Sequence, residues 1–164
     1  MSLRAGMRRS GRRVAAGESG VALVELALML PMALVVFTGL LQVGLYENNS
    51  LELQNATSLA AENLSVSRQP AGTSWDPCAL TVSAFKQVAP FLNTSNVTFT
   101  FVFQNKTATS TTSFTGTSCP ADDTVVTQQG TAQVTATYPC SLAIYGKNLA
   151  PGCTLQAQVT EVIQ

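Results

Sequence analysis

The sequence predicts an α+β fold in which a long N-terminal helix and a second, shorter helix pack on a small antiparallel β-sheet. Three observations predict it: an apolar run at residues 21–45, a continuation whose apolar residues recur near a period of 3.6, and later segments that alternate apolar and polar residues. The chain has 164 residues, which is enough for one modest domain beside the first helix.

Charged residues are scarce and unevenly distributed along the chain. Only 11% of the residues are charged, against about 25% in ordinary soluble domains, and nine basic residues balance nine acidic ones. Residues 1–20 hold five arginines and one glutamate, a net charge of +4, whereas residues 21–164 carry −4. The low charge content argues against a freely soluble enzyme, and the lack of a basic excess argues against a nucleic-acid partner.

The apolar run from Val21 to Leu45 is long enough to cross a membrane. It contains one charged residue, Glu25. A helix of this length measures roughly 37 Å, against about 30 Å for the hydrocarbon core of a bilayer. The arginines before the run and the acidic excess after it predict a cytoplasmic N-terminus, with residues 46–164 on the other side.

Two other interpretations of the run are weaker. A secretory signal peptide has a shorter apolar region that ends at a small-residue cleavage site, and residues 43–47 (Val-Gly-Leu-Tyr-Glu) offer none. A buried core helix would need more protein around it than the remaining 119 residues supply. The run is therefore interpreted as a membrane span.

Two residues inside the span are unusual there. Pro31 removes a backbone donor and is expected to kink the helix, which membrane helices tolerate. Glu25 has two interpretations. An ionisable residue in a bilayer marks a functional site by default, but Glu25 also lies close enough to the cytoplasmic interface for its carboxylate to reach water.

The surroundings of Glu25 favour the functional interpretation. Arg12 and Arg13 form a basic leader, Gly20 follows, and Glu25 stands five residues after that glycine at the head of the apolar helix. This arrangement resembles a type IV prepilin processing site. The resemblance implies that a prepilin peptidase cuts after Gly20, so that the mature chain starts at Val21 with Glu25 as its fifth residue.

The longer pattern is similar to the TadE-like family of pseudopilins over roughly the first 70 residues. The matching features are Val24-Glu25-Leu26-Ala27-Leu28, the pair Leu30-Pro31 and two later glycines, Gly39 and Gly44. Major Flp pilins usually have tyrosine directly after the glutamate and a very short mature chain, whereas this chain has Leu26 and a sizeable C-terminal part. The resemblance therefore implies a minor pseudopilin rather than the main filament subunit.

A pilin-like protein has a physical need for Glu25. Cleavage after Gly20 would create an ammonium group at Val21, and helix packing would bury that charge in apolar surroundings. An unpaired buried charge costs several kcal/mol, so a carboxylate on a neighbouring subunit would neutralise it and set the register of assembly.

The expected organisation has four parts: a leader at 1–20, a span at 21–45, an amphipathic helical continuation at 46–68 and an extracytoplasmic domain at 69–164. Within that domain a second helix is expected from Cys78 to about Leu92, with Asp76 as its cap and Pro77 in its first turn. Strands are expected at 97–103, from 125 to 138 and at 155–163.

The Thr- and Ser-rich stretch from Gln104 to Asp123 is expected to be a long loop. One interpretation is a solvated surface loop, and the other is an adhesive or partner-binding loop around Phe114.

All four cysteines, Cys78, Cys119, Cys140 and Cys153, lie after the span, and an even number in a small exported domain suggests two disulfides with three possible connectivities. We favour Cys140–Cys153, because these residues bracket a turn-rich insert between the last two strands, which leaves Cys78 to pair with Cys119. A zinc site is disfavoured by the absence of a CxxC pair and of histidine.

No catalytic residues are proposed, since the chain has no histidine for a nucleophile–base pair and no glycine-rich phosphate loop, and no metal or other cofactor is expected. Two functions remain open. The first is a structural pseudopilin of a Tad-type pilus system in the bacterial inner membrane, with other pilins, the Tad assembly machinery, the prepilin peptidase and membrane lipid as partners. The second is an uncleaved single-pass membrane protein whose adhesin-like domain binds a ligand or a surface.

Overall fold

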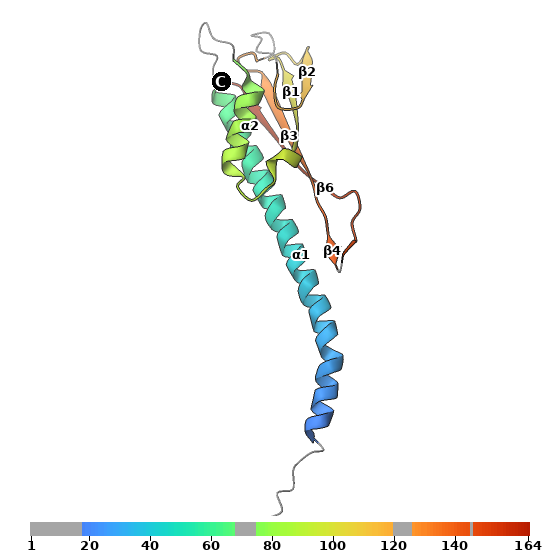
Figure 1. Ribbon diagram of the computed structural model, residues 1–164. Coiled ribbons are helices and arrows are strands. Elements are labelled where there is room, and N and C mark those ends of the chain that lie inside the picture. Colours follow the sequence, from blue (N-terminus) through green and yellow to red (C-terminus); the bar gives the residue numbers. More distant parts are fainter. Residues whose placement is uncertain (1–17, 68–74, 120–125, 145) are drawn as a thin grey trace, which may run out of the picture. The chain divides into compact units, whose positions relative to one another are not determined.

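The computed structural model describes residues 18–67, 75–119, 126–144 and 146–164. The helices are α1 (Glu18–Val66), α2 (Pro77–Val88) and a short 3-10 helix, η1 (Thr94–Asn96). The strands are β1 (Thr98–Gln104), β2 (Thr111–Thr115), β3 (Thr131–Pro139), β4 (Ala143–Ile144), β5 (Lys147–Asn148) and β6 (Thr154–Val162). Figure 1 shows these elements in order, and the predicted α+β class is confirmed.

The chain divides into two compact units, Met1–Gly39 and Leu40–Gln164. The described part of the first unit is helix α1 up to Gly39. The second, here called the C-terminal unit, contains the rest of α1 together with α2 and all of the described strands.

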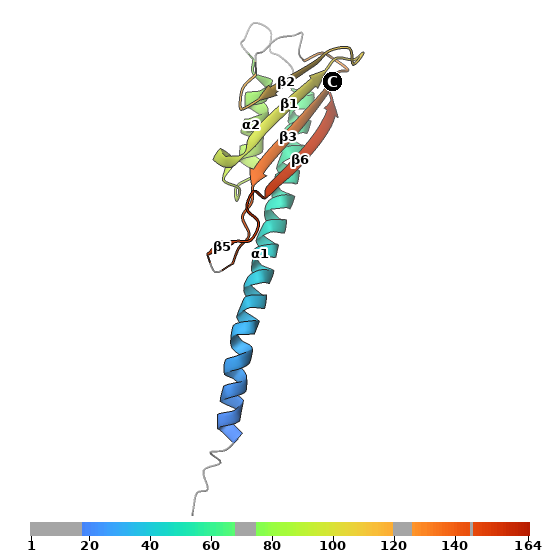
Figure 2. The same cartoon turned by 90° about the vertical axis from the view of Figure 1, so that its right-hand side faces the viewer.

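Four strands form an antiparallel sheet in the order β2-β1-β3-β6. The central pair is held in register by Phe101 opposite Val134, and β3 pairs with β6 over nine residues, from Thr131 opposite Val162 to Pro139 opposite Thr154. Helix α2 and the end of α1 cover one face of this sheet, as the two views in Figures 1 and 2 show. The other face carries mainly threonine and glutamine side chains.

The core of the C-terminal unit lies between the helices and the covered face of the sheet. Strand β1 supplies Phe99, Phe101 and Phe103 from alternate positions, as a strand with one buried face requires. Helix α1 supplies mainly small residues, which let its backbone approach the sheet and α2. The buried positions of α1 are Leu53, Ala56, Thr57, Ala60, Ala61, Leu64 and Ser65.

Helix α2 begins where the sequence predicts it and ends four residues earlier. Asp76 is its N-cap, and Pro77 occupies its first turn, where a missing N–H costs nothing. The helix ends at Val88 instead of Leu92 because Pro90 disfavours helical geometry at Ala89, which has φ −108° and ψ 67°.

Two predictions about the strands are wrong in detail. Part of the expected loop at 104–123 is strand β2, which pairs with β1 to form a hairpin whose turn lies between Gln104 and Thr111. The strand expected to begin at residue 125 starts at Thr131, because a turn precedes it in which Gln129 has φ 63°. A Cβ on Gly130 would lie 2.5 Å from the Gln104 carbonyl oxygen, so this turn requires glycine at that position.

Candidate functional site

The first part of α1 exposes its apolar side chains on all sides. Among the described residues, this is the one helix long and apolar enough to cross a membrane, and none of its most apolar stretch is buried by protein. Every leucine, valine, methionine and phenylalanine from Val21 to Phe37 is exposed. Such a surface is stable only when lipid or other apolar protein covers it.

The predicted processing site lies in the first turn of this helix. Helix α1 begins at Glu18, so the N–H of Gly20 is one of the first four, which have no intrahelical acceptor. Gly20 has no atom near the position of a Cβ, and Val21 is 59% exposed. Opening one terminal turn costs little, because it breaks few helical hydrogen bonds. The bond between Gly20 and Val21 therefore lies in a helical turn that opens at low cost.

Glu25 lies on the exposed surface of α1, one helical turn after Val21. Residues four apart share a helix face, with about 5–6 Å between their Cβ atoms. Glu25 is the only charged residue from Val21 to Leu45, so any positive charge that pairs with it comes from outside that segment or from a new chain terminus. The structure leaves the carboxylate available for either partner.

Pro31 lies inside α1, which continues through it without a break in secondary structure. Proline cannot donate to the carbonyl of Ala27, four residues earlier, so that carbonyl has no helical donor. A kink at Pro31 stays a prediction. Further along the same helix, the Thr38 hydroxyl donates to the carbonyls of Leu34 and Val35, at 2.9 and 3.0 Å, which satisfies a polar side chain within the apolar surface.

The cysteines pair as the sequence analysis favours. Cys78 is bonded to Cys119 and Cys140 to Cys153, with Cα–Cα distances of 5.5 and 5.1 Å. The first disulfide joins the buried first turn of α2 to the segment after β2. The second closes the insert between β3 and β6, where the Cys140 N–H also donates to the Cys153 carbonyl at 3.1 Å.

Both disulfides are expected to be fully formed in protein purified without reductant. Thiol alkylation followed by mass measurement should find no modified cysteine before reduction and four after it. Because the bonds close segments of 41 and 13 residues, removing them by paired serine substitution is expected to cost about 4 and about 3 kcal/mol. Four alkylated thiols before reduction would contradict this assignment.

Asp76 has a second role that the sequence analysis missed. Its Oδ1 accepts from the N–H of Ala79 at 2.9 Å, as an N-cap does, and also from the N–H of Cys119 at 3.1 Å. Its Oδ2 accepts from the Ser118 hydroxyl. One carboxylate therefore caps α2 and fixes the segment that carries the partner of Cys78. The hydrogen bonds to residues 118 and 119 span more than 40 positions in sequence, so no local sequence motif predicts them.

The pKa of Asp76 lies below its usual value of 3.8. Partial burial acts to raise it, but hydrogen bonds from the Ser118 hydroxyl and from the N–H groups of Ala79, Cys119 and Cys78 together outweigh that effect. A carboxyl whose pKa is lowered on folding stabilises the folded state above its unfolded pKa, and this contribution is lost as pH falls through the folded pKa.

Asp76→Asn is therefore expected to weaken the acid sensitivity of folding. Asparagine still caps a helix, but it does not titrate. In urea unfolding of the full chain, wild type should lose more stability than the variant between about pH 5 and about pH 3. Asp76→Ala, which also removes the cap, should cost about 0.5–2 kcal/mol at neutral pH. Equal acid sensitivity in wild type and Asp76→Asn would contradict the assignment.

The Asp76, Cys78 and Cys119 side chains are close enough together to hold a metal ion. The sulfur atoms of Cys78 and Cys119 are joined in a disulfide, however, and a disulfide sulfur lacks the thiolate charge that binds zinc. The cluster is therefore assigned a structural role.

Glu52 is a further residue that the sequence does not single out. It is half-buried, and its Oε1 accepts from the N–H of Phe91 at 2.8 Å, which ties α1 to the segment after α2. Its Oε2 is buried and has no partner among the described residues. The periodicity of a helix does not predict a contact between residues that are 39 positions apart in sequence.

Phe114, which the sequence analysis considered as the centre of an adhesive loop, lies on strand β2. Its ring is partly buried and packs edge-on against Phe103 with 6.2 Å between the ring centroids. Phe114 therefore packs at the edge of the hydrophobic core and does not lie at the exposed end of a loop.

Comparison with known proteins identifies one family. The family model described as TadE-like protein matches residues 20–62, which include Gly20, Glu25 and Pro31. No curated protein and no solved structure gives a significant match. The N-terminal part of this chain therefore carries a TadE-like segment, and the resemblance drawn from the sequence is confirmed over the greater part of α1.

Proposed function

We propose that this chain is a minor structural pilin, or pseudopilin, that takes part in the assembly of a Tad-type pilus. The observation that carries the proposal is the match of residues 20–62 to the TadE-like family, since this family is associated with Tad pilus systems. A structural role rather than catalysis also follows from that association.

Membrane insertion is proposed to occur through residues 21–45, with residues 1–20 in the cytoplasm and the C-terminal unit outside. The apolar exposure of α1 supports insertion, and the five arginines of the leader support this orientation. Formation of both disulfides in the C-terminal unit fits an oxidising compartment. We therefore propose that the protein resides in the bacterial inner membrane before it is assembled into a pilus.

Processing after Gly20 is proposed to release the mature chain. The support is the basic leader, the terminal-turn position of Gly20 and the exposure of Val21. Cleavage would place an α-ammonium group at the N-terminus of α1, where the helix dipole disfavours positive charge. The chain then needs a carboxylate near that terminus.

Glu25 is proposed to supply that carboxylate to a neighbouring subunit. It is exposed, and it is the only charged side chain in the apolar segment. Two such helices can pack in a low-dielectric medium when the terminal ammonium group of one lies against the Glu25 carboxylate of the other. If either charge is buried without its partner, packing is opposed by several kcal/mol. The pairing would fix the axial register between subunits.

The proposal is tested by deleting the gene in its own host and measuring pili sheared from the cell surface. We expect a strong loss of surface pili, restored by the wild-type chain expressed in trans. An unchanged yield of pili in the deletion strain would contradict a role in assembly and favour an uncleaved membrane protein with a binding domain.

A further inference from the structure

The insert between β3 and β6 forms a closed hairpin. Its strands β4 and β5 pair Ala143 with Asn148, and the Leu149 N–H donates to the Leu142 carbonyl at 2.8 Å. The Cys140–Cys153 disulfide closes its base, and the Asn148 side chain accepts from the Ala150 N–H at 3.0 Å. We call the described residues of this insert, 140–144 and 146–153, the disulfide hairpin. These hydrogen bonds satisfy several of its backbone groups, which lowers the cost of moving it from bulk water into the headgroup layer of a membrane.

The packing of the sheet along α1 fixes which end of the C-terminal unit carries this hairpin. At one end, the N–H of Gln164 donates to the Ser65 carbonyl at 3.1 Å. Midway, residues 156–159 of β6 line a cleft with Gln54, Asn55 and Ser58. At the other end, residues 138–141 line a cleft of about 210 Å³ with Gln42, Leu45, Tyr46 and Asn49.

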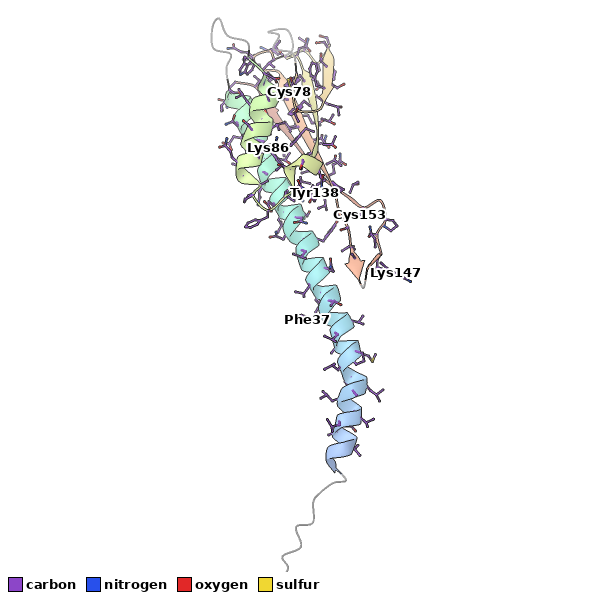
Figure 3. The ribbon with its side chains drawn as sticks, viewed as in Figure 1. Phe37, Cys78, Lys86, Tyr138, Lys147 and Cys153 are labelled. Carbon is purple, nitrogen blue, oxygen red and sulfur yellow. A yellow bond between two sulfur atoms is a disulfide. The ribbon has the colours of Figure 1, made fainter. Side chains whose placement is uncertain are left out.

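The disulfide hairpin therefore leaves the sheet beside the part of α1 where the apolar run ends. Leu40, Leu41 and Leu45 of that run are exposed in the C-terminal unit itself. Figure 3 shows Tyr138, Cys153 and Lys147 in succession along the side that extends from the sheet into the hairpin.

The exposed residues at this end have the composition of a membrane-interface segment. Lys147 is the only charged residue between Cys140 and Cys153, and it is exposed beside Leu149, which is 63% exposed. Phe91 is 83% exposed, and its N–H donates to Glu52, which lies on α1 between the middle cleft and this end. Isolated lysines and exposed apolar side chains together suit the boundary of headgroups and acyl chains.

We propose that this end of the C-terminal unit rests on the outer lipid surface, with the disulfide hairpin in the headgroup layer. Leu149 would contact the upper acyl chains, and the Lys147 ammonium would reach lipid phosphate. The inference rests on the proposed membrane span of α1. Lipid is the favoured ligand because residues 138–141 line one cleft with Leu45 at the end of the apolar run, so lipid that covers the exposed Leu41 and Leu45 would also reach the hairpin.

The hairpin would limit how the C-terminal unit tilts on the membrane. A single membrane-spanning helix can tilt and rotate in the bilayer, and the unit that packs on its end would move with it. A second point of contact, away from the helix axis, would hold the sheet in one orientation while the subunit waits for assembly. This adds a lipid-binding role to the C-terminal unit.

The test uses tryptophan fluorescence of the full chain in vesicles whose lipids carry bromine in the acyl chains. The variants are Leu149→Trp in the hairpin, Lys106→Trp in the β1–β2 turn at the opposite end, and Phe37→Trp in the apolar run. Wild type, with Trp75 as its single tryptophan, gives the baseline. We expect strong quenching of Leu149→Trp by bromines near the headgroups, weaker quenching by bromines near the chain ends, and none above baseline for Lys106→Trp.

The Phe37→Trp variant separates failure of this inference from failure of the span. Quenching of Phe37→Trp with Leu149→Trp at baseline would overturn the hairpin contact and leave the span intact. Baseline fluorescence from both would overturn the span and the hairpin contact together.

A charge variant tests the role of Lys147. In the Leu149→Trp background, Lys147→Glu should lower quenching several-fold in vesicles that contain anionic phosphatidylglycerol. Quenching that stays unchanged after Lys147→Glu would overturn the contact between the ammonium group and lipid phosphate.

Discussion

Phe101→Ala is expected to destabilise the C-terminal unit by about 3–5 kcal/mol, a large fraction of the roughly 5–15 kcal/mol that holds a typical domain. Phe101 is fully buried at the centre of β1, opposite Phe114 on β2 and Val134 on β3. Its ring stacks at 6.3 Å on Phe99, which itself meets Phe85 of α2 edge-on at 5.0 Å. Removing the ring opens a cavity where strands and helix meet.

The loss is measurable by denaturant unfolding of the full chain in detergent. Trp75, the single tryptophan, is buried just before α2 and reports on this unit by its fluorescence. Thr100→Ala is the matched control, because Thr100 is adjacent on the same strand but faces away from the core. It should cost less than about 1 kcal/mol. Equal midpoints for Phe101→Ala and wild type would show that the sheet does not pack as described.

Glu25→Gln is expected to spare membrane insertion and to abolish most incorporation into pili. The substitution keeps size and hydrogen bonding but removes the charge that we propose meets a neighbouring N-terminal ammonium. Breaking a buried ion pair by removing one partner costs about 3–5 kcal/mol at each contact, which is enough to deplete an assembly strongly.

The measurement compares the amount of the chain in the membrane fraction with the amount in sheared pili. Glu47→Gln is the matched control, because Glu47 is an exposed acid on the same helix outside the apolar run. It should incorporate as wild type does, whereas Glu25→Asp should incorporate to an intermediate extent. If Glu25→Gln were found in pili at the wild-type level, the carboxylate would have no role in assembly.

Patterns of short range were sufficient to predict the main elements. The apolar run and the helical period that follows it predict α1, the Asp76-Pro77 pair predicts the start of α2, and alternation predicts β1 and β6 within one residue at their starts. Each of these signals lies within the element that it forms. The cysteine pairing was also inferred locally, from the turn-rich insert between Cys140 and Cys153.

What escaped prediction depends on contacts between distant positions. Strand β2, with the sequence Thr-Thr-Ser-Phe-Thr, has only a half-buried face, at Thr112 and Phe114, and forms because it pairs with the edge of β1. The links from Asp76 to Cys119 and from Glu52 to Phe91 join residues 43 and 39 apart. The partner of a strand or of a buried carboxylate is determined by the folded chain as a whole, whereas periodicity is a property of one local segment. Gly20 and Glu25 were singled out by a family pattern, and their proposed roles need partners outside this chain.

The measurement that tests the central proposal most directly is the intact mass of the protein isolated from its own host. With an active prepilin peptidase, we predict a chain that begins at Val21 and lacks residues 1–20. A peptidase-deficient strain, as the control, should yield the full-length chain. Residues 1–20 still present in protein from cells with active peptidase would contradict processing at Gly20 and, with it, the assignment of this chain as a pilin-type subunit.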